Sequence, residues 1–309
     1  MRASHCLSGD PFWGRLLAVA ALSLTALLPA TALSEEADNQ KEGDSEWVRL
    51  LSDDTGGALA LQTAIGRYEG RPPGASSDVV VDLVGAVHVG DRKYYRQLDR
   101  RFPQYDALLY ELVAPPGTKV KRGQRLENDN PLGALQNGMK SVLGLEHQLE
   151  QIDYTRPNFV HADMSPKQLF QSMEERDEGF LKMYFRMVGQ SIALQSRQMA
   201  EGESVEIDMM KAMLSDNPSR ELKIVMAQQF NDLEGVISGL GGDQGSTLIE
   251  ERNRIALEGL DREIRSGKKK LAVFYGAGHL MDMDERLRRD FNLRQTGKEW
   301  VTAWDLSDD

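Results

Sequence analysis

The sequence predicts an α/β fold with a central, mostly parallel sheet, and three segments carry this prediction. The apolar runs within Asp78–Asp91, Asp106–Val113 and Lys270–Leu280 have the length and the β-branched or aromatic content of buried strands. Runs that are apolar on both faces are typical of parallel strands, which helices cover on both sides. Helical patterns lie between the runs, as α/β folds require.

Two of these runs end in the same pattern, G-A-x-H, at Gly85–His88 and Gly276–His279. Glycine removes a side chain where the backbone turns or where another group approaches closely. The carboxyl ends of parallel strands face the crevice in which open α/β sheets bind ligands, so the two histidines should share one ligand. Glu111 ends the third run and should reach the same edge. Two histidines and a carboxylate are a common set for a catalytic divalent metal ion.

Asp91 and His147 have competing interpretations. Asp91 precedes a helical pattern and is expected to cap that helix, to orient His88, or to do both. His147 lies within a helix expected at 133–151 and is interpreted as structural.

Three more residues are candidates for the same site. His161 and Asp163 end a short strand expected at 157–163, and they either extend the site or form a surface turn and helix entry. Arg252 lies on the apolar stripe of a helix expected at 246–266. A guanidinium directed toward a core needs either a carboxylate partner or a substrate.

The first 46 residues are expected to lie outside the fold. Residues 1–32 have the basic start, the apolar run and the small-x-small end of a cleavable signal peptide, and residues 33–46 are polar and acidic, as in a disordered spacer. The mature protein would then be secreted or periplasmic. It would have no transmembrane segment, because no later stretch approaches the roughly 20 apolar residues that a span needs.

Residues 47–309 are expected to form a single domain. A β-hairpin at 47–68 should add to the edge of the sheet, and 293–306 should form a final strand or hairpin. Residues from about 165 to 267 predict a large helical insertion that covers the active edge. The formal net charge of −11 argues against a nucleic acid or an anionic membrane as partner.

Four motifs, in this order, resemble the TraB family. They are G-A-V-H-V-G-D at 85–91, Y-E-L at 110–112, E-R-N at 251–253 and G-A-G-H-L at 276–280. The family includes TraB/GumN-type proteins, PrgY pheromone-shutdown proteins and the Tiki proteases. The resemblance extends from about Asp78 to the end of the chain, and the expected lack of a membrane anchor departs from the Tiki pattern.

This resemblance implies an α/β (α+β) sheet of the erythromycin-esterase/ChaN-like type. By analogy with the Tiki proteases, it also implies metal-dependent peptide hydrolysis that uses His88, His279 and Glu111. Arg252 matches the arginine of the family, and its neighbour Asn253 is a further candidate for supporting the site.

The leading hypothesis is an exported metal-dependent hydrolase, most simply a peptidase acting on peptides or proteins. Its divalent metal ion could be Mn, Co or Zn, and Glu111 would be either the third ligand or the base for a metal-bound water. Arg252 could bind a substrate carboxylate or stabilise an oxyanion.

Two other functional hypotheses stay open. The alternative from another class is a non-catalytic protein that binds and sequesters a peptide, as the pheromone-shutdown resemblance allows. A third reading, an esterase or haem-binding protein of the wider fold group, requires a nucleophile pair or a flat apolar slot that the sequence does not display.

Overall fold

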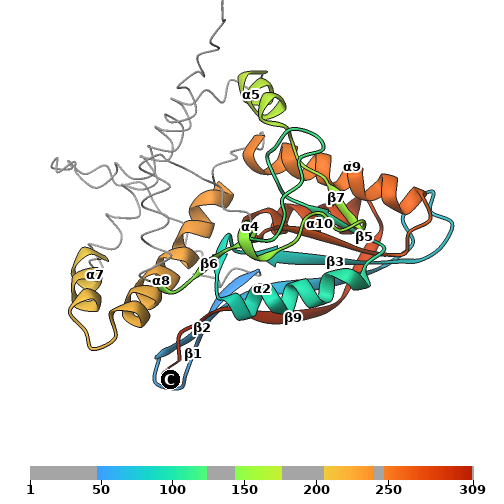
Figure 1. Cartoon of the computed structure of the whole chain (residues 1–309). Helices are drawn as coiled ribbons and strands as arrows, with labels where there is room; N and C mark the ends of the chain where they lie inside the picture. The colour runs from blue at the N-terminus through green and yellow to red at the C-terminus, as the bar shows by residue number, and fades with distance from the viewer. Residues whose placement is uncertain (1–46, 124–142, 176–204, 240–246, 308–309) are drawn as a thin grey trace, which may run out of the picture.

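A computed structural model of the chain describes residues 47–123, 143–175, 205–239 and 247–307 (Figure 1). The expectations for residues 1–46 therefore lie outside the described residues. The fold is mixed α/β, with a seven-stranded sheet in the order β1-β2-β3-β8-β5-β7 and with β9 also paired to β2. The strands are β1 (Val48–Ser52), β2 (Ala58–Gly70), β3 (Val79–Ala86), β5 (Ala107–Tyr110), β7 (Phe159–His161), β8 (Lys270–Gly276) and β9 (Leu293–Asp305).

The centre of the sheet is parallel, as the apolar runs predict. Strand β8 lies between β3 and β5, with Gly85 opposite Tyr275 and Tyr110 opposite Phe274. Strand β7 adds in parallel on the far side of β5. The strands that lead to His88, Glu111 and His279 are therefore parallel neighbours, and this part of the prediction is confirmed.

The other half of the sheet is antiparallel. The predicted hairpin at 47–68 is confirmed by the pairing of β1 with β2. The hairpin lies at the end of the sheet, as expected, with β1 as the last strand of the order. Its long strand β2 is not an edge strand, because it pairs with β1 and β3 on one side and with β9 on the other. The C-terminal strand covers the edge that the hairpin would otherwise expose.

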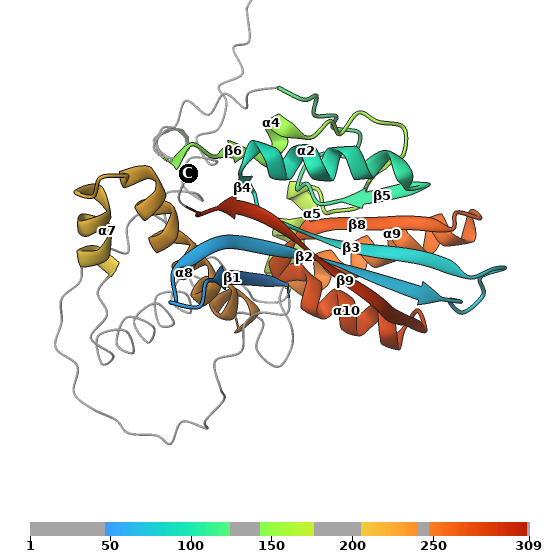
Figure 2. The same cartoon turned by 90° about the horizontal axis from the view of Figure 1, so that it is seen from below.

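Helices lie on both faces of the sheet. Figure 2 shows α2 (Arg92–Arg101) on one face, with α9 (Arg252–Arg265) and α10 (Leu280–Arg289) on the other. Apolar residues at helical spacing explain the packing, since α2 buries Tyr94, Tyr95 and Leu98, and α10 buries Leu280, Met283 and Leu287.

The helix expected at 133–151 is found only at its end, as the short α4 (Gln148–Gln151), and residues 133–142 lie outside the described residues. His147 belongs to β6 (Glu146–His147), which pairs antiparallel with β4 (Val89–Gly90), and the short α4 (Gln148–Gln151) follows. Pairing with the segment after His88 overrides the local helical pattern, as tertiary context often does.

The described residues within 165–267 are mostly helical, with a turn at 214–217. The helices are α5 (Pro166–Glu175), α7 (Val205–Met213), α8 (Pro218–Gly239), the π-turn η4 (Thr247–Glu251) and α9. Helix α9 packs on β5 and β8, whereas α8 contacts β1 and the turn η5 (Ala277–His279) at the carboxyl end of β8. Among the described helices, none is long and apolar enough to cross a membrane.

Candidate active site

Three side chains from neighbouring strand ends meet around Gly276. A side chain at this glycine would begin 3.2 Å from Glu111 Oε2 and 3.8 Å from both His88 Nε2 and His279 Cδ2. The missing side chain thus leaves a small space bordered by the two histidines and the carboxylate. His88 is exposed at this edge, whereas His279 is buried.

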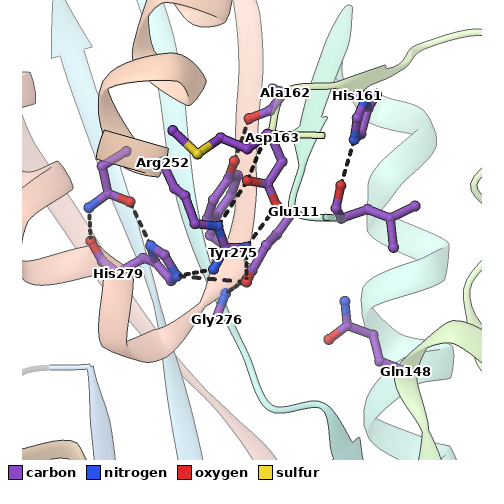
Figure 3. Close-up of polar contacts among 12 residues, drawn as sticks. Glu111, Gln148, His161, Ala162, Asp163, Arg252, Tyr275, Gly276 and His279 are labelled. Carbon is purple, nitrogen blue, oxygen red and sulfur yellow. Dashed lines mark hydrogen bonds and ion pairs between the residues drawn. The ribbon is translucent and has the colours of Figure 1, made fainter. Parts of the chain in front are cut away.

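Glu111 is held at both of its carboxylate oxygens (Figure 3). Oε2 accepts the Gly276 N–H at 2.7 Å, and Oε1 accepts Arg252 Nη2 at 2.6 Å. Burial alone would raise the pKa of Glu111, but the charges of His279, Arg252 and His88 and the Gly276 hydrogen bond outweigh it and lower that pKa to about 2. Glu111 is therefore a carboxylate across the physiological pH range.

Arg252 finds two carboxylate partners. Its Nε and Nη2 donate to Asp163 at 2.9 and 2.7 Å, and Nη2 also reaches Glu111. The Asp163 side chain is fully buried, so the guanidinium supplies the compensating charge that a buried carboxylate needs. Arg252 Nη1 lies 3.4 Å from His279 Nε2, which places the guanidinium beside the ring at the carboxyl edge of the sheet. Asp163 therefore belongs to the cluster.

His279 is buried, and Asn253 holds its ring through Nδ1. Its Nδ1 lies 2.7 Å from Asn253 Oδ1, and its Nε2 lies 3.6 Å from Glu111 Oε1. Burial lowers the pKa of His279 to about 4, although the charge of Glu111 opposes this shift. The imidazole is therefore neutral at pH 7, the state in which histidine can donate a lone pair.

His161 and Asp91 point elsewhere. His161 Nε2 lies 2.6 Å from the Leu112 carbonyl oxygen, and Figure 3 shows the ring away from the cluster. Asp91 stands at the N-cap position of α2, but its side chain makes no capping bond. It accepts Lys223 Nζ at 3.1 Å and the Asp305 N–H at 2.6 Å. Asp91 therefore occupies the expected N-cap position but does not cap the helix with its side chain, because its carboxylate instead links α8 to the end of β9.

Two residues that support the site are not predicted by the sequence. The backbone N–H of the buried Gln148 donates to the His88 carbonyl at 2.9 Å, which ties α4 to the first histidine. Asp282 accepts the Asn253 amide at 2.8 Å. No sequence signal marks Gln148, since its segment has a helical pattern. Asp282 follows His279 by three positions at a helix start, a spacing that could have drawn attention to it.

The residues suit a divalent ion in chemistry, but the described structure does not present a ready-made metal site. In the described ranges, no group of three or more histidine, cysteine, aspartate and glutamate side chains is arranged to hold a metal ion. A carboxylate and an imidazole anchored through its other nitrogen are nevertheless typical ligands. Both border the space at Gly276 together with His88, while Arg252 Nη1 competes for the lone pair of His279.

Comparison with protein-family models, with curated proteins and with solved structures finds no match for this chain.

Proposed function

We propose that the chain is an exported metal-dependent hydrolase, a peptidase, in which His88, His279 and Glu111 hold a divalent ion. The observation that carries this proposal is the meeting of these three side chains around the empty side-chain position of Gly276. They stand at the carboxyl edge of a parallel sheet, where α/β folds bind ligands. The resemblance of the motifs to the TraB family supports the same chemistry.

The state of each group suggests its role. When bound, the ion would polarise the scissile carbonyl and lower the pKa of a bound water. Neutral His279 offers a lone pair. Glu111, with a pKa of about 2, is a weak proton acceptor but a permanent anion, so its charge state favours a ligand over a general base.

Arg252 supplies positive charge at the edge of the site. Asp163 holds the guanidinium through two hydrogen bonds, so the charge is fixed in direction and not carried on a mobile side chain. A pre-oriented cation of this kind stabilises an oxyanion or binds a substrate carboxylate. A peptide with a free C-terminus is the simplest substrate that would use this contact.

Metal analysis of the purified mature protein tests the proposal, together with digestion of a peptide library with and without a chelator. We expect stoichiometric metal and chelator-sensitive cleavage. His88→Ala and His279→Ala should lower both metal content and activity by at least about tenfold, since two remaining ligands hold an ion poorly. His147→Ala, in the β6 strand opposite Val89, is the matched control and should change neither. Full metal content and full cleavage in both histidine variants would reject the proposal.

One observation favours the binding protein as the second candidate. Arg252, the only cation of the trio, is already paired with both Glu111 and Asp163, so its charge is partly used and the site could hold a ligand without completing a reaction. In that case, labelled peptides would bind stoichiometrically to the metal-loaded protein and be recovered intact after long incubation.

A further inference from the structure

A chain of hydrogen bonds links His279 to Asn253 and Asp282. Asn253, in the first turn of α9, places Oδ1 2.7 Å from His279 Nδ1. Its Nδ2 donates to the His279 carbonyl oxygen at 3.0 Å and to Asp282 Oδ2 at 2.8 Å. Asp282 stands in the first turn of α10 and also pairs with Arg286, one helical turn further on, at 2.8 Å.

These contacts fix the orientation of the Asn253 amide. Rotating it by half a turn would place Oδ1 against two groups that can only accept, the His279 carbonyl and the Asp282 carboxylate. Asn253 is fully buried, so water cannot replace the lost bonds. A buried polar group without a partner is costly, so the observed orientation is strongly preferred.

The amide in turn fixes the proton of His279. Asn253 Oδ1 is an acceptor only, so His279 Nδ1 must carry the hydrogen. Turning the ring over would present Cδ2 to Asn253 Oδ1 and lose this bond. In the neutral imidazole, Nε2 is then left with its lone pair, on the side of Glu111 and Arg252. A neutral histidine side chain in water prefers its proton on Nε2, so the protein imposes the less favoured tautomer.

We propose that Asp282 is a positioning residue that acts through Asn253 to hold His279 as the Nδ1–H tautomer. Its carboxylate is held by Arg286 and can only accept hydrogen bonds. The Asn253 group that faces it must therefore be the Nδ2 donor, whereas a hydroxyl or an amide at position 282 could face either end of the Asn253 amide. The proposal deepens the proposed function and rests on it in one respect, since Nε2 is the atom that would bind the metal. The tautomer itself is a property of the metal-free chain.

Nitrogen-15 NMR of the metal-free mature protein tests this directly. Long-range proton–nitrogen spectra distinguish a protonated Nδ1 from a protonated Nε2, and loss of one pattern in His279→Gln assigns the residue. We expect Nδ1–H in the natural sequence. Asn253→Ala and Asp282→Ala should shift the tautomer ratio toward Nε2–H by about fivefold or more, the effect of one lost hydrogen bond worth about 1 kcal/mol.

Two control variants separate tautomer control from loss of stability. Asn158→Ala removes a partly buried amide whose Nδ2 also donates to two oxygens, the carbonyls of Phe102 and Tyr105. Asp261→Ala removes another carboxylate paired with an arginine one turn ahead, Arg265, on α9. Neither should alter the His279 spectrum. Asp282→Asn can still accept through its amide oxygen if its side chain turns, and should retain most of the Nδ1–H form.

The outcomes are distinct. An Nε2–H tautomer in the natural protein would overturn the inference. A shift in Asn253→Ala without one in Asp282→Ala would remove the role of Asp282. If Asn253→Ala does not fold, the comparison of Asp282→Ala with Asp282→Asn decides, because Asp282 is only partly buried. An Nδ1–H tautomer in a protein with no metal and no cleavage would reject the proposed function and leave this inference intact.

Discussion

At the scale of single residues, the low pKa of Glu111 separates its two candidate roles. A carboxylate with a pKa of about 2 accepts a proton poorly at neutral pH. We therefore expect Glu111→Gln to lose metal affinity and activity together, by more than about tenfold each. Metal titration followed by a cleavage assay measures both. A variant that keeps its metal and loses only activity would show that Glu111 is the base.

Arg252 should contribute more to stability than any exposed arginine of the same helix. Removing it leaves Asp163 buried without its charge partner, and breaking such a pair costs about 3–5 kcal/mol. Arg254, two positions further along α9, pairs with Glu251 and Glu258 in an exposed cluster. We expect Arg254→Ala to cost less than about 1 kcal/mol. Urea unfolding of both alanine variants tests the difference, and equal losses would contradict it.

His279 should make the metal-free protein sensitive to acid. Its folded pKa of about 4 lies below the ordinary value of 6.5, so between these values the unfolded chain binds a proton that the folded chain does not. Its contribution is present above pH 6.5 and is lost as the pH falls toward 4, by at most about 1.4 kcal/mol per pH unit. Unfolding curves at pH 7, 6 and 5 should show a shallower decline in His279→Gln. Parallel declines would contradict the prediction.

At the scale of elements, the end of β8 depends on the glycine at position 276. An alanine there would place its methyl group 3.2 Å from Glu111 Oε2, in the space that the two histidines border. We expect Gly276→Ala to fold and to lose metal binding and activity by at least about tenfold, through displacement of Glu111. Gly297→Ala in β9, where the added group would meet only Arg67 at 3.9 Å, is the control. Equal activity of the two variants would show that the space is not used.

At the scale of the whole molecule, export is the testable expectation. The apolar run and the small residues at 30–32 predict cleavage after Ala32. N-terminal sequencing should therefore begin at Leu33. Ala32→Arg should accumulate the precursor, because the cleavage site needs a small residue, whereas Ala37→Arg should be processed normally. Retention of Met1 on the natural protein in the exported fraction would contradict the signal-peptide hypothesis.

The sequence by itself determined the parts of the fold that follow from local pattern. Continuous apolar runs identified the strands that lead to His88, Glu111 and His279, and the same pattern predicted that they are parallel. Each histidine follows the end of its strand by two or three residues, so its place at the carboxyl edge required no knowledge of distant contacts. The strand before His161 and the helix after Asp91 were predictable for the same reason.

Tertiary structure decided what those side chains contact. His161 ends β7 and Asp163 lies two residues beyond it, yet only Asp163 meets Arg252. Alternation along a continuing strand would place both side chains on the same face, so the bend that follows β7 decides their different directions. Asp91 bonds to Lys223 and Asp305, which are far from it in the sequence. His147 lies in a segment with a helical pattern but pairs with β4 as a strand. Asn253 on α9 donates a hydrogen bond to Asp282 on α10. Contacts between distant segments depend on how the elements pack in three dimensions, and the periodicity of a local segment does not predict them.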